Sequence, residues 1–346
     1  MKPAFNLNIS SGIWSELAHR RTRTVLAALL LAALAITLLG LRLGSYDLAW
    51  GPFFSTLWNG NQGMGGMVLL ELRLPRALVA LGAGAALATA GAIFQSLSRN
   101  PLASPDIIGL TTGSATGALV TILWLGDRAL NVPLGALVGG LATVALVYLF
   151  SLQRGMQGQR LVLIGLAIAA MLASVNDFLL TRAELDQALA AKMWLHGSLQ
   201  GSGWLQAQRL GLGCALLLPL AWLLSPRLRL LEMGDELATS LGLHVGRSHT
   251  YLTLVAVALT ALAIACAGPI GFIALAAPQL ARRLCRAPGI GVWAAALVGA
   301  VLCASADLLA RLLLAPFQIP VGLVTSALGG AYLTYLLARE WRSHDL

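Results

Sequence analysis

Apolar residues in this chain gather in long runs that are separated by short polar stretches. A transmembrane helix needs about 20 predominantly apolar residues, and ten runs approach or exceed that length. They cover residues 24–44, 70–97, 107–125, 131–152, 160–182, 204–224, 248–268, 270–286, 291–314 and 320–338. The pattern therefore predicts an all-α integral membrane protein. It consists of an N-terminal segment (1–23), a ten-span domain (24–338) and a short tail (339–346).

The polar stretch at 225–247 is too charged to enter the membrane, and it predicts a short amphipathic helix. Asp235 follows Gly234 and is a candidate N-cap, while Gly242 is a natural helix terminator. The apolar positions Leu237, Ala238 and Leu241 share one face of that helix. A helix this short is marginal in isolation. We therefore expect it to bind either a soluble partner or the lipid headgroups.

Composition supports burial in a bilayer. Hydrophobic residues make up 58% of the chain and charged residues 11%, against about 45–50% and 25% in soluble domains. The net charge of +9 is scattered over span ends and loops. A nucleic-acid partner is not expected, because its binding site would gather the basic residues on one face.

The distribution of basic residues predicts the orientation. If the amino terminus is cytoplasmic, fifteen of the 23 basic residues lie on the inner side, as the positive-inside rule requires. These are Lys2, Arg20, Arg21, Arg23, Arg99, Arg154, Arg160, Arg227, Arg229, Arg247, Arg282, Arg283, Arg286, Arg339 and Arg342. The first 23 residues lack a signal-peptide pattern. Both termini are therefore predicted to be cytoplasmic.

Few residues in the spans could carry chemistry. Asp307 precedes Arg311 by four positions, so an ion pair on one helix face is expected. Asn176 could face a cargo or make an interhelical hydrogen bond. The sequence has no phosphate-binding loop, helical zinc motif or paired cysteine spacing, so neither catalysis nor a bound metal or cofactor is predicted. Energy for uphill transport would come from an ion gradient or a separate ATPase.

Small residues recur at helical spacing in the third predicted span. Gly109, Gly113 and Gly117 lie on one stripe, which allows two helix backbones to approach closely. Close packing is one interpretation of this stripe. The other is that these glycines line a path that is wide enough for a bulky cargo.

Four separated blocks resemble one family of membrane proteins. They are ELRLPRALVALGAGAALATAGAIFQSLSRNPLASPDIIGLTTGSATG, LLEMGDELATSLGLHVGRS, AGPIGFIALAAPQLARR and the tail around LLARLLLAPFQIPVGLVTSALGGAYLTYLL. Their order and content are similar to those of the permease subunits of iron-siderophore, haem and cobalamin ABC importers, above all the ferric-enterobactin branch. The resemblance implies a type II ABC importer permease fold in the bacterial inner membrane. It also implies a ferric siderophore as cargo, of the catecholate type, with cobalamin or haem as the alternative cargo.

The same resemblance implies partners and sites. The permease would pair with a second permease subunit, with a heterodimer favoured over a homodimer, bind two ATPase subunits that hold ATP and Mg, and receive cargo from a periplasmic siderophore-binding protein. Spans three, five, eight and ten would line the path. The residues implied in ATPase coupling are Glu232, Gly234, Asp235, Ala238, Leu241 and Gly242, and those implied in binding-protein docking are Arg73, Arg76 and Arg311.

The sequence departs from the family pattern at two positions, and two of the implied roles have rival interpretations. Gln279 follows Pro278 where relatives usually have histidine, and Gln318 stands where some have glutamate. The arginines could instead anchor span ends at headgroups. An ion-coupled secondary transporter is the rival class, but such transporters use titratable groups near the midplane, and this chain has few.

Overall fold

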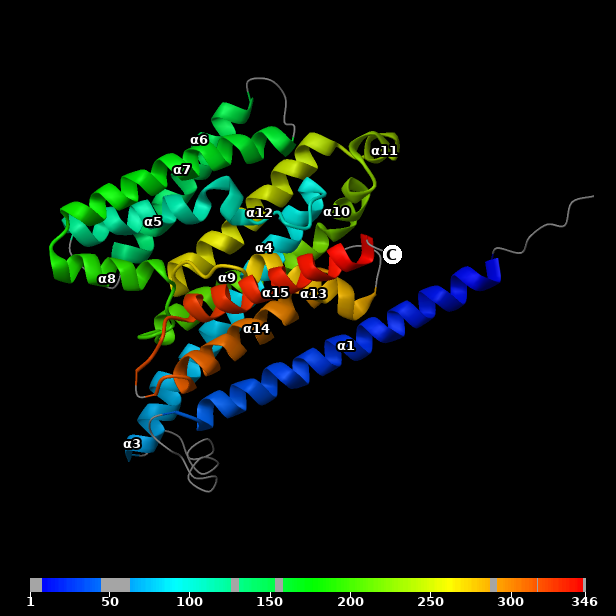
Figure 1. Cartoon of the computed structure of the whole chain (residues 1–346). Coiled ribbons are helices and arrows are strands. Elements are labelled where there is room, and N and C mark those ends of the chain that lie inside the picture. The colour runs from blue at the N-terminus through cyan, green and yellow to red at the C-terminus, as the bar shows by residue number, and fades with distance from the viewer. Residues whose placement is uncertain are drawn as a thin grey trace, which may run out of the picture.

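The computed structural model describes residues 8–44, 63–125, 131–152, 158–286, 291–315 and 317–344, and within these ranges every regular element is helical. Residues 1–7, with Lys2, and residues 345–346 of the predicted tail lie outside the described residues. Each of the ten predicted spans coincides with a helix (Figure 1). In chain order these are α1 (Asn8–Arg42), α4 (Leu74–Ser98), α5 (Leu110–Val120), α6 (Asn131–Leu152), α7 (Gly158–Arg182), α9 (Trp204–Leu223), α12 (Val245–Ala267), α13 (Ile273–Cys285), α14 (Val292–Leu312) and α15 (Val321–His344).

The helices differ in how fully they could cross a membrane. Six of those described are long and apolar enough to do so, and α9 with the following α10 (Ser225–Glu232) makes a seventh, bent by 47°. Of the remaining predicted spans, two hold shorter apolar helices, which are Leu110–Leu125 (α5 with its π-helical continuation η3, Thr121–Leu125) and Val321–Thr334 of α15. The last, α13, has 13 residues. The ten-span prediction therefore agrees with the helix order, while span lengths are unequal.

Helix α4 forms the centre of the bundle. It continues the short α3 (Gly63–Gly66) and the π-helix η1 (Met67–Arg73), and it packs against α14, α12, α13 and α9. Its small residues allow this burial, because a Cβ at Gly84 would lie 2.2 Å from the carbonyl oxygen of Gly299 on α14. Since two backbones meet there, neither position has room for a side chain.

The two ends of the bundle carry different short elements. Helix α10 and α11 (Asp235–Ser240) lie at one end, called here the loop end, where α1 begins and α15 ends (Figure 1). Helix α8 (Leu185–Leu195) and α3 lie at the other, called here the arginine end (Figure 1). Both termini of the described chain are therefore on the same side, as an even number of spans requires.

Several helix bounds differ from the sequence prediction, and the helix of the first predicted span already begins at Asn8. The third span begins at Leu110, after a 3-10 turn at Pro105–Ile108, because Gly109 takes a left-handed conformation (φ 77°) that ends the turn. The seventh begins at Val245, three residues early. The predicted loop 225–247 holds two helices, because α10 precedes α11 and begins with Pro226 in its first turn.

Candidate functional site

The arginine end is organised around one buried carboxylate, Asp307 of α14. Its side chain is 1% exposed, and Arg76 of α4 donates to its Oδ1 from Nε (3.0 Å) and Nη2 (2.8 Å). Arg311, one helical turn further on, places Nη2 3.1 Å from Oδ2. The predicted Asp307–Arg311 pair is confirmed, and Arg76 is a second partner that lies too far away in sequence to be found from spacing.

Two arginines of this end also hold the last turn of α1. Arg73 donates from Nη1 to the carbonyl oxygens of Leu41 (2.8 Å) and Arg42 (2.7 Å), while Arg311 donates to that of Gly40 (3.1 Å). The last carbonyl groups of a helix have no partner within that helix, and they carry partial negative charge. The guanidinium groups therefore act as side-chain caps for α1.

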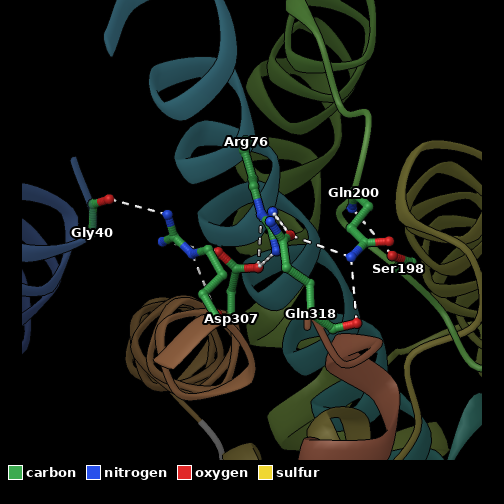
Figure 2. A network of polar contacts seen from close by, with 7 residues as sticks. Gly40, Arg76, Ser198, Gln200, Asp307 and Gln318 are labelled. Carbon is green, nitrogen blue, oxygen red and sulfur yellow. Dashed lines mark hydrogen bonds and ion pairs between the residues drawn. The ribbon is translucent and has the colours of Figure 1, made fainter. Parts of the chain in front are cut away.

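Two glutamines extend the network toward the surface. Arg76 donates from Nη1 to Oε1 of Gln318 (2.7 Å), which also accepts from Nε2 of Gln200 (3.3 Å) (Figure 2). Gln200 lies in the turn after α8, where its backbone N–H donates to Oγ of Ser198 (3.1 Å). The change from glutamate to glutamine at 318 removes a charge, but it leaves an acceptor for Arg76.

A surface pocket of about 450 Å³ opens beside this network. It is lined by Glu71, Arg73, Arg76, Gln200, Arg311 and Gln318, among others. The three predicted docking arginines therefore border one depression, although each also makes contacts within the chain. Three guanidinium groups against the carboxylates of Asp307 and Glu71 leave the depression positively charged.

The π-helix η1 explains how the arginines are presented. The N–H of Leu74 bonds to the carbonyl of Leu69 in π register, and Pro75 has no N–H to donate. The carbonyl oxygen of Leu70 is thus left over, and the indole Nε1 of Trp204 on α9 donates to it (3.1 Å). This side-chain contact stabilises an irregular backbone that ends with Arg73, and π-helical turns are frequent at functional sites.

At the loop end, the predicted short helix exists as α11 and ends as predicted. The N–H of Gly242 (φ 84°) bonds to the carbonyl of Thr239 (2.9 Å), and that of Leu243 bonds to Ala238 (2.9 Å). This pair of bonds is a Schellman motif, which requires a residue with positive φ. The predicted start is wrong, however, because Gly234 occupies the N-cap position and no side chain caps the helix.

Asp235 instead uses its carboxylate to join α11 to other elements. Its Oδ1 lies 3.4 Å from Nη2 of Arg99, which follows α4, and 3.7 Å from Nε2 of His249 on α12. The first of these is a largely exposed pair and contributes little on its own. The two contacts together show that the Asp235 carboxylate lies between the end of α4 and the start of α12.

The predicted apolar face of α11 divides in two. Ala238 is fully buried against the bundle, while Leu237 and Leu241 are 50% and 59% exposed. One small residue is enough to attach so short a helix, and the two leucines are left facing outward. An exposed leucine pair on a helix held at a fixed position is suited to contact with another surface.

Glu232, the last residue of α10, faces the bundle. Ser96 of α4 donates to its Oε1 (2.5 Å), and Nη2 of Arg282 on α13 lies 3.8 Å from the same oxygen. A pocket of about 280 Å³ adjoins them, lined by Gln95, Ser96, Arg99, Pro101, Glu232 and Arg282. The sequence placed Glu232 in the loop, but it gave no sign that the side chain reaches α4 and α13.

The glycines of α5 lie mainly against another helix. A Cβ at Gly113 would lie 2.0 Å from Oγ1 of Thr143, and one at Gly117 would lie 2.0 Å from the carbonyl oxygen of Gly135, both on α6. The packing interpretation is thus confirmed. Gly113 and Gly117 also border an open groove of about 620 Å³ between α5 and α6.

Two neighbouring polar residues on α7, Asn176 and Asp177, differ in environment. Asn176 is buried and donates from Nδ2 to the carbonyl of Thr112 on α5 (3.3 Å), which is the interhelical bond that the sequence allowed. Its Oδ1 is buried without a hydrogen-bond partner among the described residues. Asp177 is exposed on the outer face of the same helix. Among the described residues, no cluster of three or more His, Cys, Asp or Glu side chains could hold a metal ion.

A bundle of apolar helices that could cross a membrane, with a short helix that exposes two leucines at one end and a charged depression at the other, is typical of a multi-pass membrane transport protein. The profile of the FecCD transport family matches residues 29–339. The chain belongs to this family of permease subunits of ABC importers.

Individual relatives agree along almost the whole chain. The ferric enterobactin transport system permease protein FepG of Escherichia coli K12 is 45% identical over 322 residues, which cover 92% of this chain and 98% of FepG. The hemin transport system permease protein HmuU of Yersinia pestis is 38% identical over 331 residues, covering 90% and 96%. A solved metal-chelate type ABC transporter in an inward-facing conformation superposes with a TM-score of 0.79 at 28% identity, covering 92% of this chain and 99% of that chain.

Proposed function

We propose that this chain is the permease subunit of a binding-protein-dependent ABC importer that carries a ferric catecholate siderophore across the bacterial inner membrane. The observation that carries the proposal is the 45% identity to FepG over nearly the full length of both chains. The cargo crosses without any bond being broken. ATP and Mg are bound by two separate ATPase subunits, and this chain supplies the path.

The loop end is the proposed ATPase-binding site. Leu237 and Leu241 provide an exposed apolar surface, while Ala238, Asp235 and the turns at Gly234 and Gly242 hold the helix that presents them. Because the ATPase is cytoplasmic, this proposal places the loop end and both termini on the cytoplasmic side. Movement of the ATPase dimer would pull on α11 and shift the population between outward-facing and inward-facing states.

The arginine end is the proposed docking site for a periplasmic siderophore-binding protein. Its positive depression is complementary to carboxylates on such a partner. Charged contacts of this kind raise the association rate and fix the register more than they raise affinity. Because Arg73, Arg76 and Arg311 also hold α1 and Asp307, the partner would meet an arrangement that is already formed.

A second permease subunit completes the proposed path. The groove between α5 and α6, with Gly113 and Gly117 on its wall, is one candidate surface, and Gly109 and Asn176 lie at the adjoining contact of α5 with α7. We favour a similar but distinct second chain over a second copy of this one. Affinity purification of the chain with each candidate subunit, followed by mass measurement of the intact complex, distinguishes the two.

Transport by reconstituted vesicles tests the proposal. Vesicles that contain this permease with its genomic neighbours for the second permease and the ATPase should take up radiolabelled ferric enterobactin when ATP is inside and the loaded binding protein is outside. Uptake of haem or cobalamin instead would move the chain to another cargo of the same family. Uptake driven by a proton or sodium gradient without the ATPase would reject the importer assignment.

A further inference from the structure

Helix α13 is short, and both of its ends have unusual backbone conformations. It is 13 residues long, and the residues at both of its ends, Phe272 (φ 65°) and Arg286 (φ 50°), take left-handed backbone conformations although neither is glycine. Such conformations are disfavoured for residues with a side chain, and they persist only where surrounding contacts enforce them. The backbone therefore leaves the helical conformation abruptly at Phe272 and at Arg286.

One end of α13 contacts the loop end of the bundle. Arg282 lies in its last turn, 3.8 Å from the Glu232 carboxylate that Ser96 also holds. Glu232 is separated from α11 by only Met233 and Gly234. A displacement of α11 would therefore move the Glu232 carboxylate, and this carboxylate contacts Arg282.

The other end of α13 contacts α15. A Cβ at Gly329 would lie 2.3 Å from Cγ and Cδ1 of the Phe272 ring, so the ring rests directly on the α15 backbone. The next residue, Gly330, has no atom within 4 Å of its Cβ position. The ring contact is therefore specific to Gly329, and a shift of Phe272 would have to be followed by α15 or the contact would be lost. Arg283, in the last turn of α13, also lies over the ring of Tyr332 on α15, 6.0 Å from its centroid.

The contact between Glu232 and Arg282 can rearrange without leaving a dry void. The pocket of about 280 Å³ beside it is open, and two polar atoms at its wall, Oε1 of Gln95 and Nε of Arg282, are buried without a hydrogen-bond partner among the described residues. Water in a polar pocket of this size can bond to such atoms. The carboxylate can therefore exchange partners between Ser96, Arg282 and water.

We propose that α13 relays movement of the ATPase-facing loop to α15, with the Glu232–Arg282 contact as its input and the Phe272 ring on Gly329 as its output. This inference rests on the proposed function, since it assumes that the loop end binds an ATPase. Glu232 is then a positioning residue that acts through Arg282. It is not itself part of the ATPase contact.

The Glu232–Arg282 contact is tested by measuring ATPase binding and siderophore transport per ATP separately. In the reconstituted complex, Glu232→Gln should copurify with the ATPase as wild type does and should still hydrolyse ATP. The number of siderophores moved per ATP should fall about fivefold or more. The control is Asp186→Asn, an exposed carboxylate on α8, which should leave that ratio unchanged. Exchanging the charges, Glu232→Arg with Arg282→Glu, should restore at least about half of the ratio.

The contact between Phe272 and Gly329 is tested by comparing alanine substitutions at two neighbouring glycines of α15. Gly329→Ala places a methyl group where the Phe272 ring now lies, whereas Gly330→Ala meets open space. Only the first should lower transport per ATP. Phe272→Leu in the Gly329→Ala background should recover it, because the smaller side chain makes room.

The outcomes of these experiments distinguish failure of the relay from failure of the importer assignment. An unchanged ratio in Glu232→Gln, or equal effects of the two glycine variants, would overturn the relay. Loss of ATPase copurification in Glu232→Gln would also overturn it, because Glu232 would then belong to the binding surface, while the importer assignment would stand. If the wild-type chain binds no ATPase, the proposed function itself fails.

Discussion

Removal of the Asp307 carboxylate should destabilise the permease more than loss of any exposed acid. In Asp307→Ala, the guanidinium groups of Arg76 and Arg311, whose side chains are 11% and 10% exposed, would lose their shared counter-charge. Breaking a buried ion pair by removing one partner costs about 3–5 kcal/mol. The entropy of unfolding is about 2.1 cal/mol/K per residue, so for a chain of this length the melting temperature should fall by about 4–7 °C.

The assay is thermal unfolding of the detergent-solubilised protein, followed by intrinsic tryptophan fluorescence. Asp177→Ala is the matched control, because that carboxylate is exposed on α7. A triple variant, Arg76→Met with Asp307→Leu and Arg311→Met, removes all three charges together and should melt above Asp307→Ala. It should still melt below wild type, because the bond from Arg311 to the Gly40 carbonyl of α1 is lost as well. If Asp307→Ala melts within about 1 °C of Asp177→Ala, water already screens the arginines, and the reasoning from burial is refuted.

Three further predictions follow from exposure, close packing and charge. Leu237→Asp should leave the melting temperature unchanged, because exposed substitutions cost within about 0.5 kcal/mol, but copurification of the ATPase should fall about tenfold; retained copurification would show that α11 is not the docking helix. Gly117→Ala should cost about 1–3 kcal/mol in thermal unfolding, since its Cβ would lie 2.0 Å from the Gly135 carbonyl oxygen, and equal melting of Gly117→Ala and Gly330→Ala would contradict this. Raising ionic strength from about 0.1 M to 1 M shortens the Debye length from about 10 Å to 3 Å and should slow binding-protein association measured by stopped flow, less steeply in Arg73→Gln than in wild type.

Local patterns in the sequence predicted the elements whose causes are local. The apolar runs located all ten span helices, the i, i+4 spacing found the Asp307–Arg311 pair, and Gly242 marked the end of α11. Each of these follows from residues within one or two helical turns. The spacing of Gly113 and Gly117 likewise allowed close packing of two helices, and the structure places both glycines against α6.

The contacts that assemble the two ends depend on residues far apart in sequence. Arg76 meets Asp307 across 231 positions, and Ser96 meets Glu232 across 136. Nothing in one sequence indicates such pairs. Helix α8 was missed for a different reason, because its signals were present: Asp186 lies in its first turn, and Gly197 (φ 65°) follows its end. Its 11 residues fell between two predicted spans and were treated as a connection.

The hydrogen bonds from Arg73 and Arg311 to the last turn of α1 constrain the order in which this protein can be assembled. The hydrogen bond from Arg311 to the carbonyl of Gly40 joins positions 271 residues apart, and α14, on which α1 packs, is also made late. At about 5–20 residues per second, synthesis of the intervening chain takes about 15–50 s. Helix α1, which is made before the rest of the described bundle, is therefore locked in place among the last, and until then only Arg73 is available to hold its final turn.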